Sequence, residues 1–202
     1  MTVVDEVTLK HLGRVEYLPT LEAMRRFTRE RDDGTADELW LLEHPPVYTL
    51  GQGAAPVRVA NGIPVIAADR GGEVTYHGPG QVVLYTLVDL GRRGIKVREF
   101  VRLLEQAVIE LIGSRAARRP GAPGVYVDGA KVAALGIRLM RGRAYHGLAL
   151  NVDMDLSPFL AIDPCGYPGL AVTQTRDLGI PGTPLEVGER LAGLVTEALE
   201  HA

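Results

Sequence analysis

Three strand-like segments in the middle of the chain, joined by very short turns, restrict the possible fold more than any other feature. Residues 124–127, 130–139 and 144–152 are mostly apolar, and they are separated by Asp128-Gly129 and Arg141-Gly142. Turns of this length and composition are typical of β-hairpins. The sequence therefore predicts an antiparallel meander over residues 124–152.

Helical and extended segments surround the meander in an irregular order. Apolar residues at helical spacing predict helices at 20–31 and 97–112, the second ended by Gly113. A capping box, Thr183-Pro-Leu-Glu186, opens a last helix. Extended segments are predicted at 3–17 (with a bend near Gly13), 38–43, 47–51, 63–68 and 82–88. Residues 70–81 are expected to form a structured loop, and residues 114–124 a basic connection. One short helical turn is expected to begin with Ser157 as its cap.

This order favours an α/β (α+β) fold, a mixed β-sheet flanked by helices, over a doubly wound sheet. The length of 202 residues fits a single catalytic domain over residues 1–202, in which residues 153–202 could form a smaller C-terminal lobe. Residues 82–88 form an unbroken apolar run, which is typical of a strand buried on both faces.

Composition excludes several classes of protein. A single cysteine cannot form an intrachain disulfide, so the chain does not need an oxidising compartment. There is no apolar run near the ~20 residues that span a bilayer, and residues 1–6 lack the pattern of a signal peptide. The net charge of −3 provides no general attraction to nucleic acid. We therefore expect a cytoplasmic protein that binds neither membrane nor nucleic acid.

Lys131, one of only three lysines, lies within a predicted apolar strand. Ala133, Leu135 and Ile137 are expected on its face, and the opposite face is apolar too. Partial desolvation there would disfavour the charged amine, so that Lys131 could act as a base or pair with an anion. The alternative is that its side chain reaches solvent at the end of the strand.

The only cysteine, Cys165, lies between Pro164 and Gly166, which predicts a stiff, tight turn. Taken alone, a single cysteine is more often a small buried apolar residue. A nearby cation would instead favour its nucleophilic thiolate. Cys165 and Lys131 could then form a dyad in which the lysine activates the sulfur and moves a proton.

Glycines in the segment 70–81 would allow backbone N–H groups to approach a ligand closely, although a pair of tight turns is the simpler interpretation. The segment lacks the spacing of a phosphate-binding P-loop. His146 shares a strand face with Leu148 and Leu150, where a hydrogen-bonded core histidine is more common than a ligand. A zinc site made of three histidines and Cys165 is disfavoured because no pair has local ligand spacing.

Four motifs resemble those of the lipoyl(octanoyl) transferases, members of the biotin/lipoate protein ligase superfamily. They are Arg70-Gly-Gly-x-Val-Thr-Tyr-His-Gly-Pro-Gly-Gln81, Lys131-Val-Ala-Ala-Leu-Gly-Ile-Arg138, His146-Gly-Leu-Ala-Leu-Asn151 and Pro164-Cys165-Gly166, and His44-Pro-Pro-Val-Tyr-Thr-Leu-Gly51 is similar to the N-terminal motif of the family. The resemblance covers residues 44–166. One departure is Gln174, where family members often have serine.

The resemblance implies a fold like that of the ligase catalytic domains, with no metal or nucleotide cofactor. It implies that an octanoyl group moves from octanoyl-acyl carrier protein to a lysine of lipoyl domains in 2-oxo acid dehydrogenase complexes and the glycine cleavage H protein. Cys165 would carry the group as a thioester, with Lys131 as acid/base partner. The implied substrate-binding residues are Arg70, Gly71, Gly72, Tyr76, His77, Gly78, Ala134, Leu135, Gly136, His146, Gly147 and Leu148, with His44 as a secondary candidate.

Two other activities remain as alternatives. A lipoate or biotin protein ligase of the same fold would activate a free acid with ATP and would not need the cysteine. A non-catalytic acyl-binding module would form no covalent adduct. A further hypothesis is that Arg138, Arg141 and Arg143 form a basic rim beside the site, where an acidic carrier protein could bind. A solvated arginine surface without a binding role explains the same sequence equally well.

Overall fold

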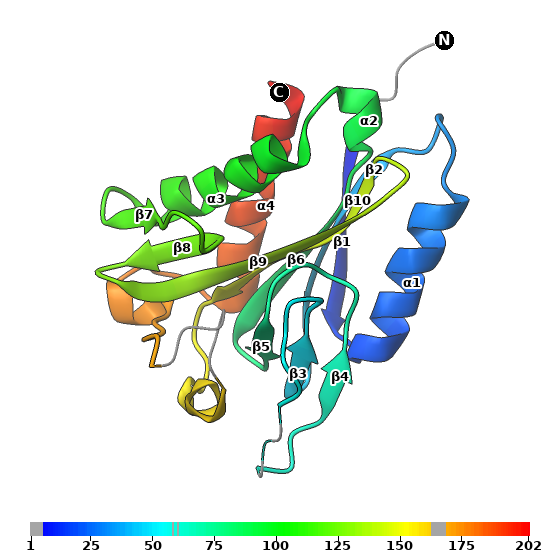
Figure 1. Ribbon diagram of the computed structural model, residues 1–202. Helices are drawn as coiled ribbons and strands as arrows, with labels where there is room; N and C mark the ends of the chain where they lie inside the picture. The colour runs from blue at the N-terminus through cyan, green and yellow to red at the C-terminus, as the bar shows by residue number, and fades with distance from the viewer. Residues whose placement is uncertain (1–5, 58, 60, 163–168) are drawn as a thin grey trace.

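The predicted meander lies within a seven-stranded mixed β-sheet of order β1-β2-β6-β10-β9-β8-β7 (Figure 1). The computed structural model describes residues 6–57, 59, 61–162 and 169–202. β1 and β2 are parallel, and the other neighbouring strands are antiparallel. The strands are β1 (Val7–Arg14), β2 (Asp37–Glu43), β6 (Gln81–Leu87), β7 (Ala116–Arg118), β8 (Gly124–Val127), β9 (Ala130–Met140) and β10 (Arg143–Asn151).

Both predicted hairpin turns of the meander are confirmed. Asp128 and Gly129 have φ values of 49° and 85°, and Arg141 and Gly142 have values of 53° and 79°. Two successive positive φ values define the turn whose twist matches that of paired strands. These turns set the register of β8, β9 and β10.

A second sheet of three strands, with the order β4-β3-β5, lies at one end of the large sheet (Figure 1). β3 (Val47–Leu50) pairs in parallel with β4 (Val65–Ala67) and antiparallel with β5 (Val74–His77). The prediction of a loop over residues 70–81 is therefore wrong for its central part. The sequence did not predict β5 because the glycines and proline on both sides of it are typical of turns.

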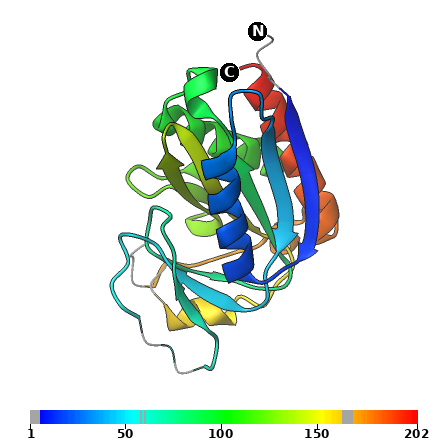
Figure 2. The same cartoon turned by 90° about the vertical axis from the view of Figure 1, so that its right-hand side faces the viewer.

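Helices cover both faces of the large sheet. α1 (Tyr17–Glu30) packs on one face, and α3 (Val97–Ile112) and α4 (Pro184–Glu200) pack on the other (Figures 1 and 2). The shorter α2 (Leu90–Arg93), η1 (Ser157–Ala161) and η3 (Thr175–Leu178) complete the elements used below. No helix among the described residues combines the length and the apolar character needed to cross a membrane.

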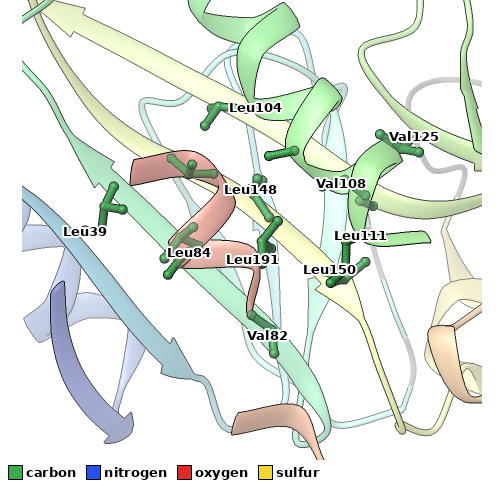
Figure 3. Packing of buried hydrophobic residues seen from close by; sticks show 14 of the residues in the cluster. Leu39, Val82, Leu84, Leu104, Val108, Leu111, Val125, Leu148, Leu150 and Leu191 are labelled. Carbon is green, nitrogen blue, oxygen red and sulfur yellow. The ribbon is translucent and has the colours of Figure 1, made fainter. Parts of the chain in front are cut away.

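The apolar run of β6 is buried on both faces, as predicted. Val82 and Leu84 pack with α3 and α4 in the larger core cluster (Figure 3), whereas Val83 and Tyr85 pack with α1. Leu191 of α4 joins the first cluster. Alternate side chains of β6 thus bind the two helical layers together, and burial of each large apolar side chain contributes about 1.5–3 kcal/mol.

Several predicted boundaries need correction. The first strand ends at Arg14, and α1 begins at Tyr17 instead of Thr20, because proline is tolerated in the first helical turn. The connection 114–124 contains β7, and Ser157 is the first residue of η1, not its cap. In contrast, the capping box at Thr183 and the end of α3 at Gly113 are confirmed.

Candidate functional site

A cavity of about 670 Å³ lies where the two sheets meet. Its walls come from α1, α3, β5, β6, β9, β10 and the connections around them. Of the residues singled out from the sequence, the cavity wall includes Arg70, Gly71, Gly72, His77, Lys131, Ala134, Leu135, Gly136, His146, Gly147 and Leu148. The structure thus brings together residues from three separate motifs, 70–81, 131–138 and 146–151.

Lys131 lies on the cavity wall and is almost completely buried, with 3% of its surface exposed. Its Nζ donates to Pro123 O at 3.1 Å and lies 5.2 Å from the centre of the Tyr126 ring. A Cβ at Gly124 would lie 3.1 Å from this nitrogen, so glycine there provides the space for the amine. The alternative of a solvated lysine is therefore wrong.

A β-bulge decides which way Lys131 points. The pairing of β8 with β9 shifts between Val125 and Tyr126, which leaves Val132 as an additional residue in β9. Val132 and Ala133 both pack in the core beneath α3 and α4, so strict alternation is interrupted there. The expectation that Ala133, Leu135 and Ile137 share the face of Lys131 is wrong, because all three pack with the core beneath α3 and α4. Lys131 lies instead on the same side as Ala134.

Cys165 lies outside the described residues. The described residues on either side of its segment, Phe159 and Val172, both line the cavity. Val172 forms a parallel bridge with Lys131, in which Lys131 N–H donates to Ala171 O at 2.8 Å. The chain that follows the cysteine is thus bound directly to the backbone of Lys131.

The segment Arg70–Gly72 closes over β9. Arg70 Nη2 donates to Thr49 O at 2.7 Å and to Thr49 Oγ1 at 2.8 Å, while Gly71 N–H donates to Ile137 O at 3.0 Å. A Cβ at Gly136 would approach Gly71 O to 2.9 Å, so this contact requires glycine. The predicted close backbone approach therefore occurs between two parts of the chain itself.

Tyr76 and Gly78 do not line the cavity. Tyr76 packs against Tyr48 and Phe159 in a separate cluster beneath the small sheet. A Cβ at Gly78 would lie 2.3 Å from the Tyr76 hydroxyl. Both residues support the small sheet, which explains their place in the motif without contact to a ligand.

A chain of hydrogen bonds runs from His77 towards Lys131. His77 Nδ1 contacts Gln81 Oε1 at 2.7 Å, Gln81 Nε2 donates to Asn151 Oδ1 at 3.0 Å, and Asn151 Nδ2 donates to Thr173 O at 3.0 Å. Thr173 N–H in turn donates to Lys131 O at 2.9 Å. Gln81 and Asn151 were not predicted as site residues, although both end quoted motifs.

His146 has an unusual backbone for a strand residue, with φ of 62°. Its Nε2 lies 2.7 Å from Asp69 Oδ1, and Asp69 Oδ2 accepts from Tyr145 and Arg25. Burial raises the pKa of Asp69, but these hydrogen bonds outweigh it and hold the pKa well below its usual range. Burial lowers the pKa of His146. Asp69 thus fixes the ring of His146, and sequence patterns gave no sign of it.

His44 lies behind the cavity wall instead of on it. Its Nδ1 donates to Val15 O at 2.6 Å, because a carbonyl oxygen only accepts, so its Nε2 accepts from the Tyr85 hydroxyl at 2.7 Å. Burial lowers the pKa of His44 to about 4. This secondary candidate therefore supports Tyr85, which does line the cavity.

These buried histidines should make stability depend on pH. Burial lowers the pKa of His77 to about 3, and an unfolded histidine titrates near ~6.5. As pH falls below 6.5 the unfolded chain takes up protons that neither His77 nor His44 accepts in the folded state. We expect the free energy of unfolding to fall by about 4 kcal/mol between pH 7 and pH 5, roughly half from each histidine.

Urea denaturation across this pH range measures the effect. Changing His77 to glutamine should reduce the slope by about half, whereas changing the exposed His201 to glutamine should leave it unchanged. A free energy that stays level between pH 7 and pH 5 would contradict the neutral state of both buried rings.

Among the described residues, no three histidine, cysteine, aspartate or glutamate side chains gather as metal ligands. Gln174, the departure from the family pattern, accepts a hydrogen bond from Met154 N–H through its Oε1 at 2.7 Å. It therefore connects the segment after Cys165 with the segment before η1.

The proposed basic rim is wrong in its position for Arg141 and Arg143. Arg141 follows the end of β9 and Lys131 is near its start, a separation of about 30 Å for ten strand residues. The hairpin tip contacts α2 through Gly91 N–H and Gly142 O. Arg143 donates to Asp89 at 3.0 Å and is mostly buried, so it is not available to a partner beside the cavity.

Comparisons with known proteins agree with this geometry. Residues 16–192 match the lipoyl protein ligase A/B catalytic domain. An octanoyltransferase of Thiobacillus denitrificans is 60% identical, covering 97% of this chain and 90% of that protein. An octanoyltransferase of Dechloromonas aromatica is 57% identical, with coverage of 96% and 97%.

Solved structures with much lower identity share the fold. Lipoate-protein ligase A bound with ATP has a TM-score of 0.76 at 17% identity, covering 96% of this chain and 85% of that one. Biotin protein ligase from Aquifex aeolicus, in complex with biotin and ATP, has a TM-score of 0.57 at 13% identity, covering 95% and 70%. At these identities the likeness concerns the fold alone.

Proposed function

Because this chain belongs to the lipoyl protein ligase A/B catalytic domain family, and is an acyltransferase of the octanoyltransferase type, we propose that it works through a covalent thioester. Cys165 would accept an octanoyl group from octanoyl-acyl carrier protein and pass it to a lysine of a lipoyl domain. The acceptors would be lipoyl domains of 2-oxo acid dehydrogenase complexes and the glycine cleavage H protein. We further propose that residues 1–202 act as one catalytic domain.

One observation carries this proposal. Lys131 is the lysine of the cavity wall, it is buried, and its backbone is bonded to the segment that follows Cys165. A buried amine beside a thiol favours the thiolate, which is the nucleophile of thioester exchange. The connection between Val172 and Lys131 supports a short distance between the two groups.

The reaction would have two steps. In the first, the Cys165 sulfur attacks the donor carbonyl, the carbonyl–sulfur bond of the donor breaks, and Lys131 passes the thiol proton to the departing sulfur. In the second, the acceptor amine attacks the acyl-enzyme, the bond to Cys165 breaks, and the amine proton returns to the cysteine sulfur through Lys131. The donor thioester is already activated, so the balance requires no nucleotide.

Apolar and small residues of the cavity would bind the acyl chain. Ala134, Ala149 and Val83 lie side by side on one row of β9, β10 and β6. Each methylene group buried against such a surface contributes about 0.8 kcal/mol. A saturated chain therefore matches this floor better than a charged or strongly polar ligand.

Intact-mass measurement tests the proposal. After incubation with octanoyl-acyl carrier protein and no ATP, we expect the protein to gain one octanoyl unit, which a lipoyl domain then removes. A Cys165→Ala variant should gain none. Activity that needs ATP and free octanoate and survives in Cys165→Ala would identify a ligase. No adduct on either protein, with octanoate binding retained, would identify an acyl-binding module.

A further inference from the structure

We propose that Tyr17 closes the far end of the acyl cavity and thereby sets the length of chain that the enzyme accepts. This inference rests on the proposed function, because it takes the Lys131 end of the cavity as the reacting end. Tyr17 is the first residue of α1, is 3% exposed and lines the cavity. No sequence motif pointed to it.

The strand registers place Lys131 and Tyr17 at opposite ends of the cavity. Lys131 Nζ lies next to Gly124 of β8, which begins a row that crosses the sheet. The row continues through Ala134 and Ala149 to Val83 of β6. The residues of this row on β9 and β10 are alanines, whose small side chains leave space in the cavity above them.

The row ends at a group of aromatic rings. Tyr85 follows Val83 by two residues on the same face of β6, and its ring lies 5.8 Å from that of His44. Tyr17 lies 5.2 Å from the same His44 ring and stacks on His77 at 6.2 Å, with 14° between the planes. The rings of Tyr17, His77 and Tyr85 form the end wall, and His44 packs behind them.

The distance between the two ends suits an eight-carbon chain. From Gly124 to Tyr85 there are three strand spacings of ~4.8 Å and one two-residue step of ~6.7 Å, which places them about 16 Å apart. Allowing ~3 Å for a hydrogen bond at Lys131 and ~4 Å for van der Waals contact at the wall leaves about 9 Å. An extended chain with seven C–C bonds of ~1.5 Å also spans roughly 9 Å.

The Tyr17 hydroxyl distinguishes it from the rest of the wall. The Tyr85 hydroxyl bonds to His44, and the His77 ring bonds to Gln81. In contrast, the Tyr17 hydroxyl is buried without a hydrogen-bond partner among the described residues, and burial raises its pKa to about 12. A methyl end fits against this wall, but a longer chain would have to displace the ring.

A comparison of chain lengths tests the inference. In wild type, octanoate is expected to bind more tightly than decanoate, and octanoyl-acyl carrier protein to be used better than the decanoyl form. Tyr17→Val should shift both the ratio of Kd values and the ratio of kcat/KM values towards the ten-carbon ligand by about tenfold, the factor for burying two more methylene groups. Tyr17→Phe keeps the shape of the wall and should keep the wild-type ratios.

Leu21→Val is the matched control. Leu21 lies one turn further along α1 in the same core cluster as Tyr17, but it does not line the cavity. Loss of folded protein alters the rates with both donors equally, so neither ratio should change in this variant. Ratios for Tyr17→Val within twofold of wild type would overturn the inference.

The binding and transfer measurements separate the inference from the proposed function. If the binding ratio shifts in Tyr17→Val but no variant transfers an acyl group, Tyr17 limits chain length and the proposed function is wrong. If wild type transfers octanoyl groups and neither ratio shifts, the proposed function stands and the role of Tyr17 is wrong. If wild type neither binds a fatty acid nor transfers an acyl group, both are wrong.

Discussion

Replacing Lys131 with methionine is expected to lower kcat/KM for octanoyl transfer about 10³-fold, while the protein stays folded. A general acid/base group contributes roughly 10²- to 10⁴-fold to a rate. Methionine keeps the length of the side chain and removes the amine from a position that is 3% exposed. The variant should therefore lose the proton transfer and the stabilisation of the thiolate, together with the hydrogen bond to Pro123 O.

Two measurements on this variant separate chemistry from folding. The rate of alkylation of the single thiol at pH 7 should fall together with transfer, because both depend on the thiolate. The unfolding transition in urea should remain cooperative. Lys10→Met is the control, since Lys10 is exposed and pairs with Glu38 on β2. Transfer by Lys131→Met within tenfold of the rate of Lys10→Met would exclude the dyad.

Replacing Asp37 with asparagine is expected to lower the free energy of unfolding by about 3–5 kcal/mol, the usual cost of breaking a buried ion pair. Asp37 is fully buried at the start of β2. Its carboxylate pairs with Arg31 at 2.6 Å, Arg92 at 2.8 Å and Arg93 at 2.7 Å. Asparagine has a similar volume but would leave three guanidinium groups without the charge that compensates them.

Asp37 joins elements that are distant in the sequence. Arg31 follows α1, while Arg92 and Arg93 belong to α2, and Arg93 also donates to Leu199 O of α4 at 2.8 Å. Burial raises the pKa of Asp37, but the hydrogen bonds from Asp89 N–H and the arginines outweigh it, so the pKa is lowered. Its stabilising effect is therefore full above an unfolded pKa near ~3.9 and disappears as the pH falls below that value.

The control for Asp37→Asn is the same substitution in an exposed aspartate–arginine ion pair. Asp128→Asn breaks the ion pair with Arg115, in which both side chains are more than half exposed, and should cost less than about 1 kcal/mol. Urea denaturation at pH 7 measures both variants. Asp37→Asn with a loss no larger than that of Asp128→Asn would show that the buried arginines are stabilised by other groups.

Local sequence determined the elements whose geometry depends on neighbouring residues. The turn at Asp128-Gly129 needs two positive φ values, and Asp-Gly adopts them at low cost. The helix 97–112 follows from apolar residues at a spacing of three and four, and Gly113 ends it through its own backbone freedom. The capping box at Thr183 likewise involves only residues within one turn.

The sequence by itself also determined which motifs supply the cavity wall, since the segments 70–81, 131–138 and 146–151 all place residues on it. What only the tertiary structure decided is the direction and surroundings of each side chain. The bulge at Val132 turns Lys131 towards the cavity, and it exists because β8 and β9 pair out of step. Asp69 contacts His146, which is 77 residues further along the chain, and the ring of Tyr17 on α1 stacks on that of His77 on β5. Such contacts depend on how strands and helices pack, which no local pattern of residues encodes.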